Sequence, residues 1–361
     1  MAFPLVMKDG GGTMQDKALN SITSKIRAKY GKMLTFSDYK QLSGLSSVSE
    51  IASYLRTRTK YSEALSGAND SAIHRDHLED MLKKYRISET ASICRFERSV
   101  GDEMFRFTVR REEADALLQF IRLLYANNIE SYIPKLSYTL DKYSNIDFVG
   151  LCNVKDVSGM RNFLSATDFR TAALLMSDDS PADFDIIETA FERVVYETAF
   201  KSIATYSDES ARQSLKNMLI LTAELSDCSV IIRGKRYYGA APDDIGPDLL
   251  GYTYLIPQKT FKKMLIAENA DAAEEIFKNT GYSRYIERFG TADPDELRLM
   301  ILHSLASHNI HFSSSPPVVM MSYFAELDIE TANLIRIIEG VRYKVSPEQI
   351  LGNIIARTEG N

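Results

Sequence analysis

The chain carries one phrase of sequence twice. The stretches "IIRGKRYYGAAPDDI" and "IIEGVRYKVSPEQI" each close with a proline, an acidic residue and an isoleucine. A blurred third copy, "FIRLLYANNIESYI", comes earlier in the chain. Repetition within a chain is typical of one supersecondary unit that is used several times, so it limits the possible folds more than any single motif does.

A second pattern, a threonine followed two residues later by an aromatic residue, occurs three times. Its copies are Thr59/Tyr61, Thr167/Phe169 and Thr280/Tyr282. The aromatic positions are 108 and 113 residues apart (169 − 61 and 282 − 169). A unit of this length exceeds the 20 to 50 residues of solenoid repeats and is long enough to bury its own core. We expect the threonine hydroxyl to cap a short helix and the aromatic ring to pack inward without binding a ligand.

The dominant hydrophobic period is helical. Between Tyr323 and Lys344, apolar residues recur at helical spacing, which places them on one helix face. Only the fragment "FRFTVR", 105–110, resembles a strand. We therefore predict an all-α protein of three similar helical domains: a leader at 1–16, then domains at 17–142, 143–252 and 253–361.

The repeated phrase itself predicts an amphipathic helix, a break and a new helical turn. The break falls at Gly239 and Pro242 in one copy and before Pro347 in the other. A proline suits the first turn of the new helix, and Ser346 is a suitable N-cap before Pro347.

Composition excludes several classes of protein. Net charge is −6 and the basic residues are dispersed, so a dedicated nucleic-acid surface is not expected. No apolar run approaches the roughly 20 residues that span a bilayer. The three cysteines, Cys94, Cys152 and Cys228, form no CxxC pair, and we interpret them as core thiols of a cytosolic protein.

The sequence indicates no catalytic, cofactor-binding or metal-binding residue. "RGKRYYG" lacks the spacing and the GK[ST] ending of a phosphate-binding loop, and no nucleophile motif is present. The five histidines, in "IHRDH" and "HSLASHNIH", leave a metal site conceivable, but no cysteine or HExxH motif accompanies them. We interpret them as surface residues.

The residues near the C-terminus resemble a known family. The stretch "YFAELDIETANLIRIIEGVRYKVSPEQI", the N-terminal "IRAKYGKMLTFSDYKQL" and the triple repeat together resemble the C subunits of the V-type and A-type rotary ATPases, which are equivalent to the d subunits of the eukaryotic enzymes. The residues that fit the C-terminal family pattern are Glu330, Asn333, Leu334, Ile337, Ile338, Gly340, Pro347, Glu348 and Ile350. Val341 stands where the family commonly has lysine, and Cys228 and Ser229 stand in the region of the second copy where Asn-Leu is expected.

The resemblance implies a funnel of three helical domains in a pseudo-threefold arrangement around a central cavity. It implies a position at the foot of a rotor, on the cytoplasmic face of a membrane. One side receives the D and F subunits of the axle, and the other lies in the mouth of the membrane-embedded proteolipid ring. Such a protein transmits torque between ATP hydrolysis or synthesis and the translocation of H⁺ or Na⁺, without catalysing a reaction and without a cofactor.

The repeated phrase also supplies the candidate site residues. Arg233, Lys235, Arg236 and Arg342 are candidates for contact with carboxylates or helix ends of a partner. The structural part of the motif is Gly234, Tyr237, Pro242, Asn333, Gly340, Tyr343, Pro347 and Glu348, with the two tyrosines expected at the core edge. A different function, a helical scaffold or adaptor for another soluble partner, fits the same residues.

Overall fold

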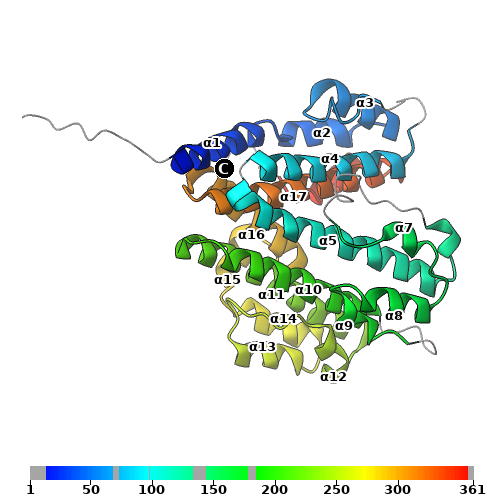
Figure 1. Ribbon diagram of the computed structural model, residues 1–361. Helices are drawn as coiled ribbons and strands as arrows, with labels where there is room; N and C mark the ends of the chain where they lie inside the picture. The colour runs from blue at the N-terminus through cyan, green and yellow to red at the C-terminus, as the bar shows by residue number, and fades with distance from the viewer. Residues whose placement is uncertain (1–13, 68–72, 97, 133–143, 178–183, 357–361) are drawn as a thin grey trace, which may run out of the picture.

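The computed structural model describes residues 14–67, 73–96, 98–132, 144–177 and 184–356 (Figure 1). Within these ranges every regular element is a helix and there is no strand, so the predicted all-α class is confirmed. The strand-like fragment 105–110 lies inside a long helix, with Phe105 and Val109 buried one turn apart. Most of the expected leader, 1–13, lies outside the described residues, and a helix begins at Met14.

Six long helices, arranged as three consecutive pairs, form the framework of the body (Figure 1). The pairs are α4 (Arg75–Phe96) with α5 (Arg98–Tyr125), α10 (Phe184–Ala204) with α11 (Glu209–Arg233), and α16 (Pro294–Phe312) with α17 (Pro316–Arg342). An additional helix, α1 (Met14–Tyr30), packs mainly on α17 and also contacts α4 and α16.

The ends of the pairs that are joined by short connections meet in one shared core. Ile93 of α4, Phe105 of α5, Ile203 of α10, Leu215 of α11 and Tyr323 of α17 all belong to this buried cluster. The second helix of each pair enters the shared core with its N-terminal half, and the first helix with its C-terminal half.

The other halves of the long helices diverge into three peripheral clusters that are built alike. One cluster joins α5 to α10, the next joins α11 to α16, and the third joins α17 to α4. The third cluster combines the N-terminal and C-terminal parts of the sequence, since Leu82 and Leu334 both lie in it. Each long helix therefore extends from the shared core into one peripheral cluster.

Short helices complete each peripheral cluster. They are α2 (Phe36–Ser43) and α3 (Val48–Arg58); α7 (Phe148–Leu151), α8 (Val157–Ser165) and α9 (Arg170–Ala173); and α13 (Gln258–Leu265), α14 (Ala270–Lys278) and α15 (Ser283–Phe289). Helices α3, α8 and α14 begin alike: Ser47, Asp156 and Asn269 each accept a hydrogen bond from the backbone N–H three residues on. Such a cap satisfies an N–H that the helix leaves free.

The threonine pattern has the same geometry in all three places. Each hydroxyl donates to a carbonyl at the end of the preceding helix, over 2.6, 2.8 and 2.7 Å for Thr59, Thr167 and Thr280. Each hydroxyl also accepts from the N–H of the aromatic residue two positions on. The three rings are buried, with at most 1 % exposed. The expected capping and inward packing are confirmed.

The expectation of three core thiols is only partly confirmed. Cys94 and Cys228 are buried, but Cys152 is exposed. Cys152 directly follows the four-residue helix α7, whose two buried residues, Phe148 and Leu151, occupy the inward positions.

Candidate partner interface

The second helix of each long pair ends in a left-handed residue. These residues are Asn127 (φ 52°), Gly239 (φ 59°) and Lys344 (φ 58°), after α5, α11 and α17. In the second copy a π-helical turn, Gly234–Tyr238, stands between α11 and the left-handed Gly239. Glycine adopts this conformation without the steric cost that asparagine and lysine incur. The blurred copy, which comes first along the chain and has no proline at this point, ends in a 3-10 turn, η2 (Ile129–Ser131).

The glycine and isoleucine of the phrase contact each other. After the break, α12 (Pro242–Ile245) and α18 (Pro347–Gly352) start with proline, and Ser346 caps α18 as predicted. A Cβ added to Gly340 would lie 2.6 Å from Cγ1 of Ile350, and one added to Gly234 would lie 3.2 Å from Cγ1 of Ile245. The glycines therefore let the isoleucine of the following short helix pack directly on the backbone of the long helix.

The returning chain is held by a side chain of the long helix in both full copies. Asn333 donates to the carbonyl of Ile355 over 2.7 Å and accepts from its N–H over 3.1 Å. Asp227 accepts from the N–H groups of Leu250 and Gly251, both over 2.8 Å. Asp227 therefore occupies the asparagine position of the second copy, immediately before Cys228. Burial raises the pKa of Asp227 to about 6, although the two N–H donors act in the opposite direction.

The two tyrosines of the phrase are on the surface. Tyr237 is 71 % exposed and Tyr343 is 67 % exposed, so their expected place at the core edge is wrong. They follow the last buried positions, Ile232 and Val341, at the point where each long helix extends beyond its cluster. Tyr238 is also exposed.

Three of the four candidate basic residues already have partners within the chain. Lys235 donates to the carbonyl of Ala267, Arg236 pairs with Asp271 and Glu274, and Arg233 lies 3.7 Å from Asp295. Arg342 is exposed, with its guanidinium over the ring of Tyr343. Glu348 lies exposed in the first turn of α18. Arg342 is thus the candidate most available to a partner.

Sequence reasoning missed a buried glutamate on each long second helix. Glu224 accepts from the N–H groups of Tyr254, Leu255 and Ile256 and from the hydroxyl of Tyr282, and none of its surface is exposed. Three of these donors lie just before α13, the first short helix of the third unit, and Tyr282 lies between α14 and α15. The glutamate therefore fixes these residues to α11.

Glu330 and Glu113, the corresponding glutamates of α17 and α5, also accept hydrogen bonds from segments outside their own helices, but from different residues. Glu330 accepts from the N–H of Leu34 and the hydroxyl of Tyr61, and it pairs with Lys60. Glu113 accepts from Ser144 and pairs with Arg110, in the unit where phenylalanine replaces tyrosine. The sequence does contain a signal, because a glutamate recurs at the same position of each second long helix. The residues that bind these glutamates differ in type and in distance along the chain, so the sequence does not reveal the pairing.

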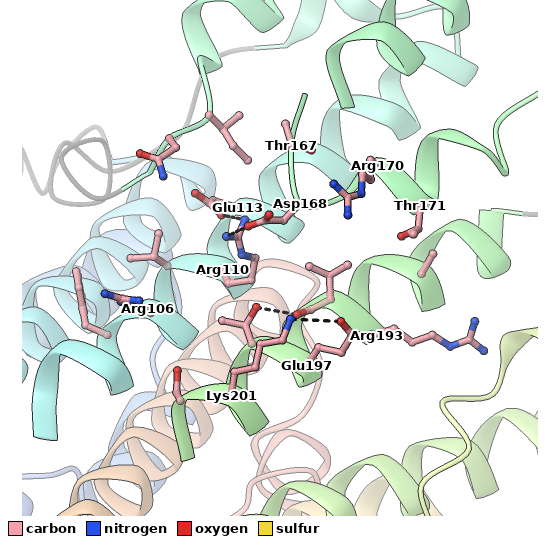
Figure 2. Close-up of a pocket in the computed structure, with 18 of the residues that line it drawn as sticks. Arg106, Arg110, Glu113, Thr167, Asp168, Arg170, Thr171, Arg193, Glu197 and Lys201 are labelled. Carbon is pink, nitrogen blue, oxygen red and sulfur yellow. Dashed lines mark hydrogen bonds and ion pairs between the residues drawn. The ribbon is translucent and has the colours of Figure 1, made fainter. Parts of the chain in front are cut away.

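A large groove lies between α5 and α10, beside α9 (Figure 2). Its volume is about 1240 Å³, and it is lined by equal numbers of basic and acidic side chains. Arg110 reaches both Glu113 and Asp168, and Lys201 lies 3.8 Å from Glu197 (Figure 2). Such a mixed surface suits a polypeptide partner more than a polyanion.

One carboxyl on α10, that of Glu192, has a raised pKa. Glu192 is exposed at the surface of α10. Partial desolvation of its carboxyl by the surrounding protein, with repulsion from Glu188, raises the pKa of Glu192 to about 7. The charge of Arg298 opposes this shift, whereas Asp227 and Asp115 add to it.

We expect Glu192→Gln to alter the pH dependence of stability. Because the folded chain binds this proton more tightly than the unfolded chain, the wild-type free energy of unfolding falls as pH rises from 4.5 to about 7. The variant lacks this component, so at pH 8 it should be more stable by about 1 kcal/mol after allowance for solvent screening. Urea unfolding at pH 5 and pH 8 measures the difference; equal pH slopes for both proteins would contradict the assignment.

The histidines have separate contacts. His303 lies 2.9 Å from Glu326, whereas His308 and His311 pack against Phe312. Among the residues that the structure describes, no three His, Cys, Asp or Glu side chains are grouped so as to hold a metal ion. In the same ranges no helix combines the length and apolar composition that crossing a bilayer requires.

Comparison with known families gives one match. The family model vATP-synt_AC39, described as ATP synthase (C/AC39) subunit, matches residues 22–352. The matched range includes both full copies of the phrase and the blurred third copy. A comparison with curated proteins found no match.

Proposed function

Because the chain belongs to the ATP synthase (C/AC39) subunit family, a family of V-type and A-type rotary ATPase subunits, we propose that it is the non-catalytic coupling of the central stalk. In this proposal it seats the D and F subunits of the axle on the proteolipid ring and transmits torque between them. It acts at the cytoplasmic face of the membrane, and its repeat units are 17–142, 143–252 and 253–361.

The observation that carries the proposal is the continuity of the long helices. Helix α17 has 27 residues, which corresponds to about 40 Å, and it extends from the shared core into a peripheral cluster. Helices α5 and α11 do the same for the other two clusters. A close-packed body with continuous helices deforms little under load, and this is what a coupling between two rotating parts needs.

Reconstitution with and without the chain tests this function. A rotary ATPase assembled without it should still hydrolyse ATP, because the catalytic sites lie elsewhere, but ion pumping should fall to background. Adding the purified chain should restore pumping. The two rates are measured on the same vesicles, by phosphate release and by an ion-sensitive dye.

Co-purification supplies the control. A tagged chain should bring down the D and F subunits and the proteolipid in constant ratio. If these proteins are absent and pumping is unchanged without the chain, the coupling role is wrong and the adaptor role is favoured instead.

A further inference from the structure

A groove of about 890 Å³ separates the start of α16 from the end of α17 and from α18. Arg298 lines it from α16, Arg336 and Tyr343 line it from the α17 side, and Ile355 lines it from the returning chain. The exposed ring of Tyr343 and the side chain of Val345, 39 % exposed, stand at this groove.

The corresponding place in the second unit is filled by the chain itself. After α12, the 3-10 turn η4 (Gly246–Asp248) itself lies against α10. Arg193 of α10 donates to the carbonyls of Pro247 and Leu249, over 3.2 and 2.6 Å. Thr189 of α10 donates to the carbonyl of Asp248 over 3.1 Å. Side chains of the first helix of the pair thus hold this 3-10 turn and the residue after it by their carbonyl groups.

The third unit has the returning chain but lacks this attachment. Asn333 holds Ile355 as Asp227 holds Leu250, so the two segments correspond. Within the described residues, however, no hydrogen bond joins α16 to 353–356. The bond to this segment comes instead from α17, where Arg336 donates to the carbonyl of Asn353 over 3.2 Å. The space that is filled beside α10 is therefore open beside α16.

The two arginines of the groove lack full sets of acceptors. The Nε of Arg298 is buried and has no acceptor among the described residues, and its Nη2 lies 3.5 Å from Asp295. Burial, and the charge of Arg298, lower the pKa of Arg336. A buried donor without an acceptor destabilises the protein unless a ligand supplies one.

The four carboxylates that line the groove already have partners of their own. Asp295 also accepts from Ser229 and faces Arg233, Glu296 accepts from Thr291, and Glu339 faces Arg75. Asp293 caps α16, and Glu192 of α10, which does not line the groove, interacts with Arg298 only through its charge. The groove thus offers two guanidinium groups to a further acceptor, and a carboxylate matches them in charge and in geometry.

We propose that this groove receives a short segment of a neighbouring subunit, with a carboxylate of that segment held by Arg298 and Arg336. The proposal rests on the proposed function, because it places the chain in a complex of several subunits. The segment lies beside α16 as residues 247–249 lie beside α10, and Tyr343 and Val345 cover its apolar side chains.

A photo-crosslinker in the intact complex tests the proposal. Benzoylphenylalanine replaces Tyr343, and in a second preparation it replaces Leu174, which is 85 % exposed at a distant element, the end of α9. We expect the Tyr343 position to cross-link to a segment of another subunit that carries an aspartate or glutamate next to the linked residue. The double substitution Arg298→Gln, Arg336→Gln should reduce this yield about tenfold, or about 1.4 kcal/mol in affinity, and leave the Leu174 cross-links unchanged.

Folding and assembly are checked separately. The thermal midpoint of the isolated variant and its amount in the complex show whether the double variant is folded and bound, and Arg336→Lys, which keeps the charge, should lose less. Cross-links only to this chain's own C-terminal residues, cross-links to a segment without an acidic residue, or a yield that ignores the arginine substitutions would overturn the proposal. A chain that fails to co-purify with any ATPase subunit would overturn the proposed function. The proposal for the groove would then fail as well, because it depends on that function.

Discussion

Glu224→Ala is expected to lower the free energy of unfolding by about 3–5 kcal/mol. The substitution leaves three backbone N–H groups and the hydroxyl of Tyr282 without their acceptor in a site with no exposed surface. Each buried donor without a partner costs about 1–3 kcal/mol, and water entering the vacated space offsets part of the sum. Urea unfolding measures the total, and hydrogen exchange at Tyr254, Leu255 and Ile256 should show where protection is lost.

Two matched variants separate the buried contact from a general effect of removing a glutamate. Glu287→Ala removes an exposed carboxylate in the same cluster and should change stability by less than about 0.5 kcal/mol. Glu224→Gln keeps one acceptor oxygen and should fall between the two. A loss below about 1 kcal/mol for Glu224→Ala, with the three amides still protected, would show that the glutamate does not hold the segment.

The helical parts of this fold were predictable because their signals are local. The apolar period of α17, the proline start of α18 and the threonine turns each involve contacts within a few residues, so the sequence displays them directly. The contact of Gly340 with Ile350 was not predicted, although the repeated phrase keeps both residues at nearly constant spacing.

The long-range arrangement was not predictable in the same way. Nothing in the sequence near Leu82 indicates that it shares a cluster with Leu334, since that contact depends on how the last long helix returns to the first short helices. Glu330 likewise finds its partners Leu34 and Tyr61 almost the whole chain away.

The tyrosines of the phrase show a related limit. An aromatic residue at the end of an apolar helix face is usually placed at the core edge, but α17 extends beyond its last buried residue, Val341. The helix end, and with it the exposure of Tyr343, is set by the left-handed Lys344 and not by the apolar period.

Gly340→Leu is expected to uncouple ion pumping from ATP hydrolysis. A Cβ at this position would lie 2.6 and 2.7 Å from Cγ1 and Cδ1 of Ile350, closer than real Cβ atoms approach other atoms. Overpacking of this kind costs about 1–3 kcal/mol and displaces α18 from the end of α17. If the chain transmits torque as proposed, the number of ions moved per ATP should fall, while hydrolysis by the isolated catalytic head stays unchanged.

The chain offers both a control and a rescue for this variant. Gly352 ends α18 with no atom within 4 Å of an added Cβ and with no left-handed backbone, so Gly352→Leu should leave coupling intact. Adding Ile350→Ala to Gly340→Leu removes the two clashing carbons and should restore part of the ion-to-ATP ratio, because the two positions are in direct contact.

Comparing Gly340→Ala with Gly234→Ala tests whether the loss of coupling follows the severity of the clash. Gly234→Ala should have the smaller effect, since it requires a shift of only a few tenths of an ångström at Ile245. A Gly340→Leu complex that pumps at the wild-type ratio would mean that this contact stabilises the fold without carrying torque.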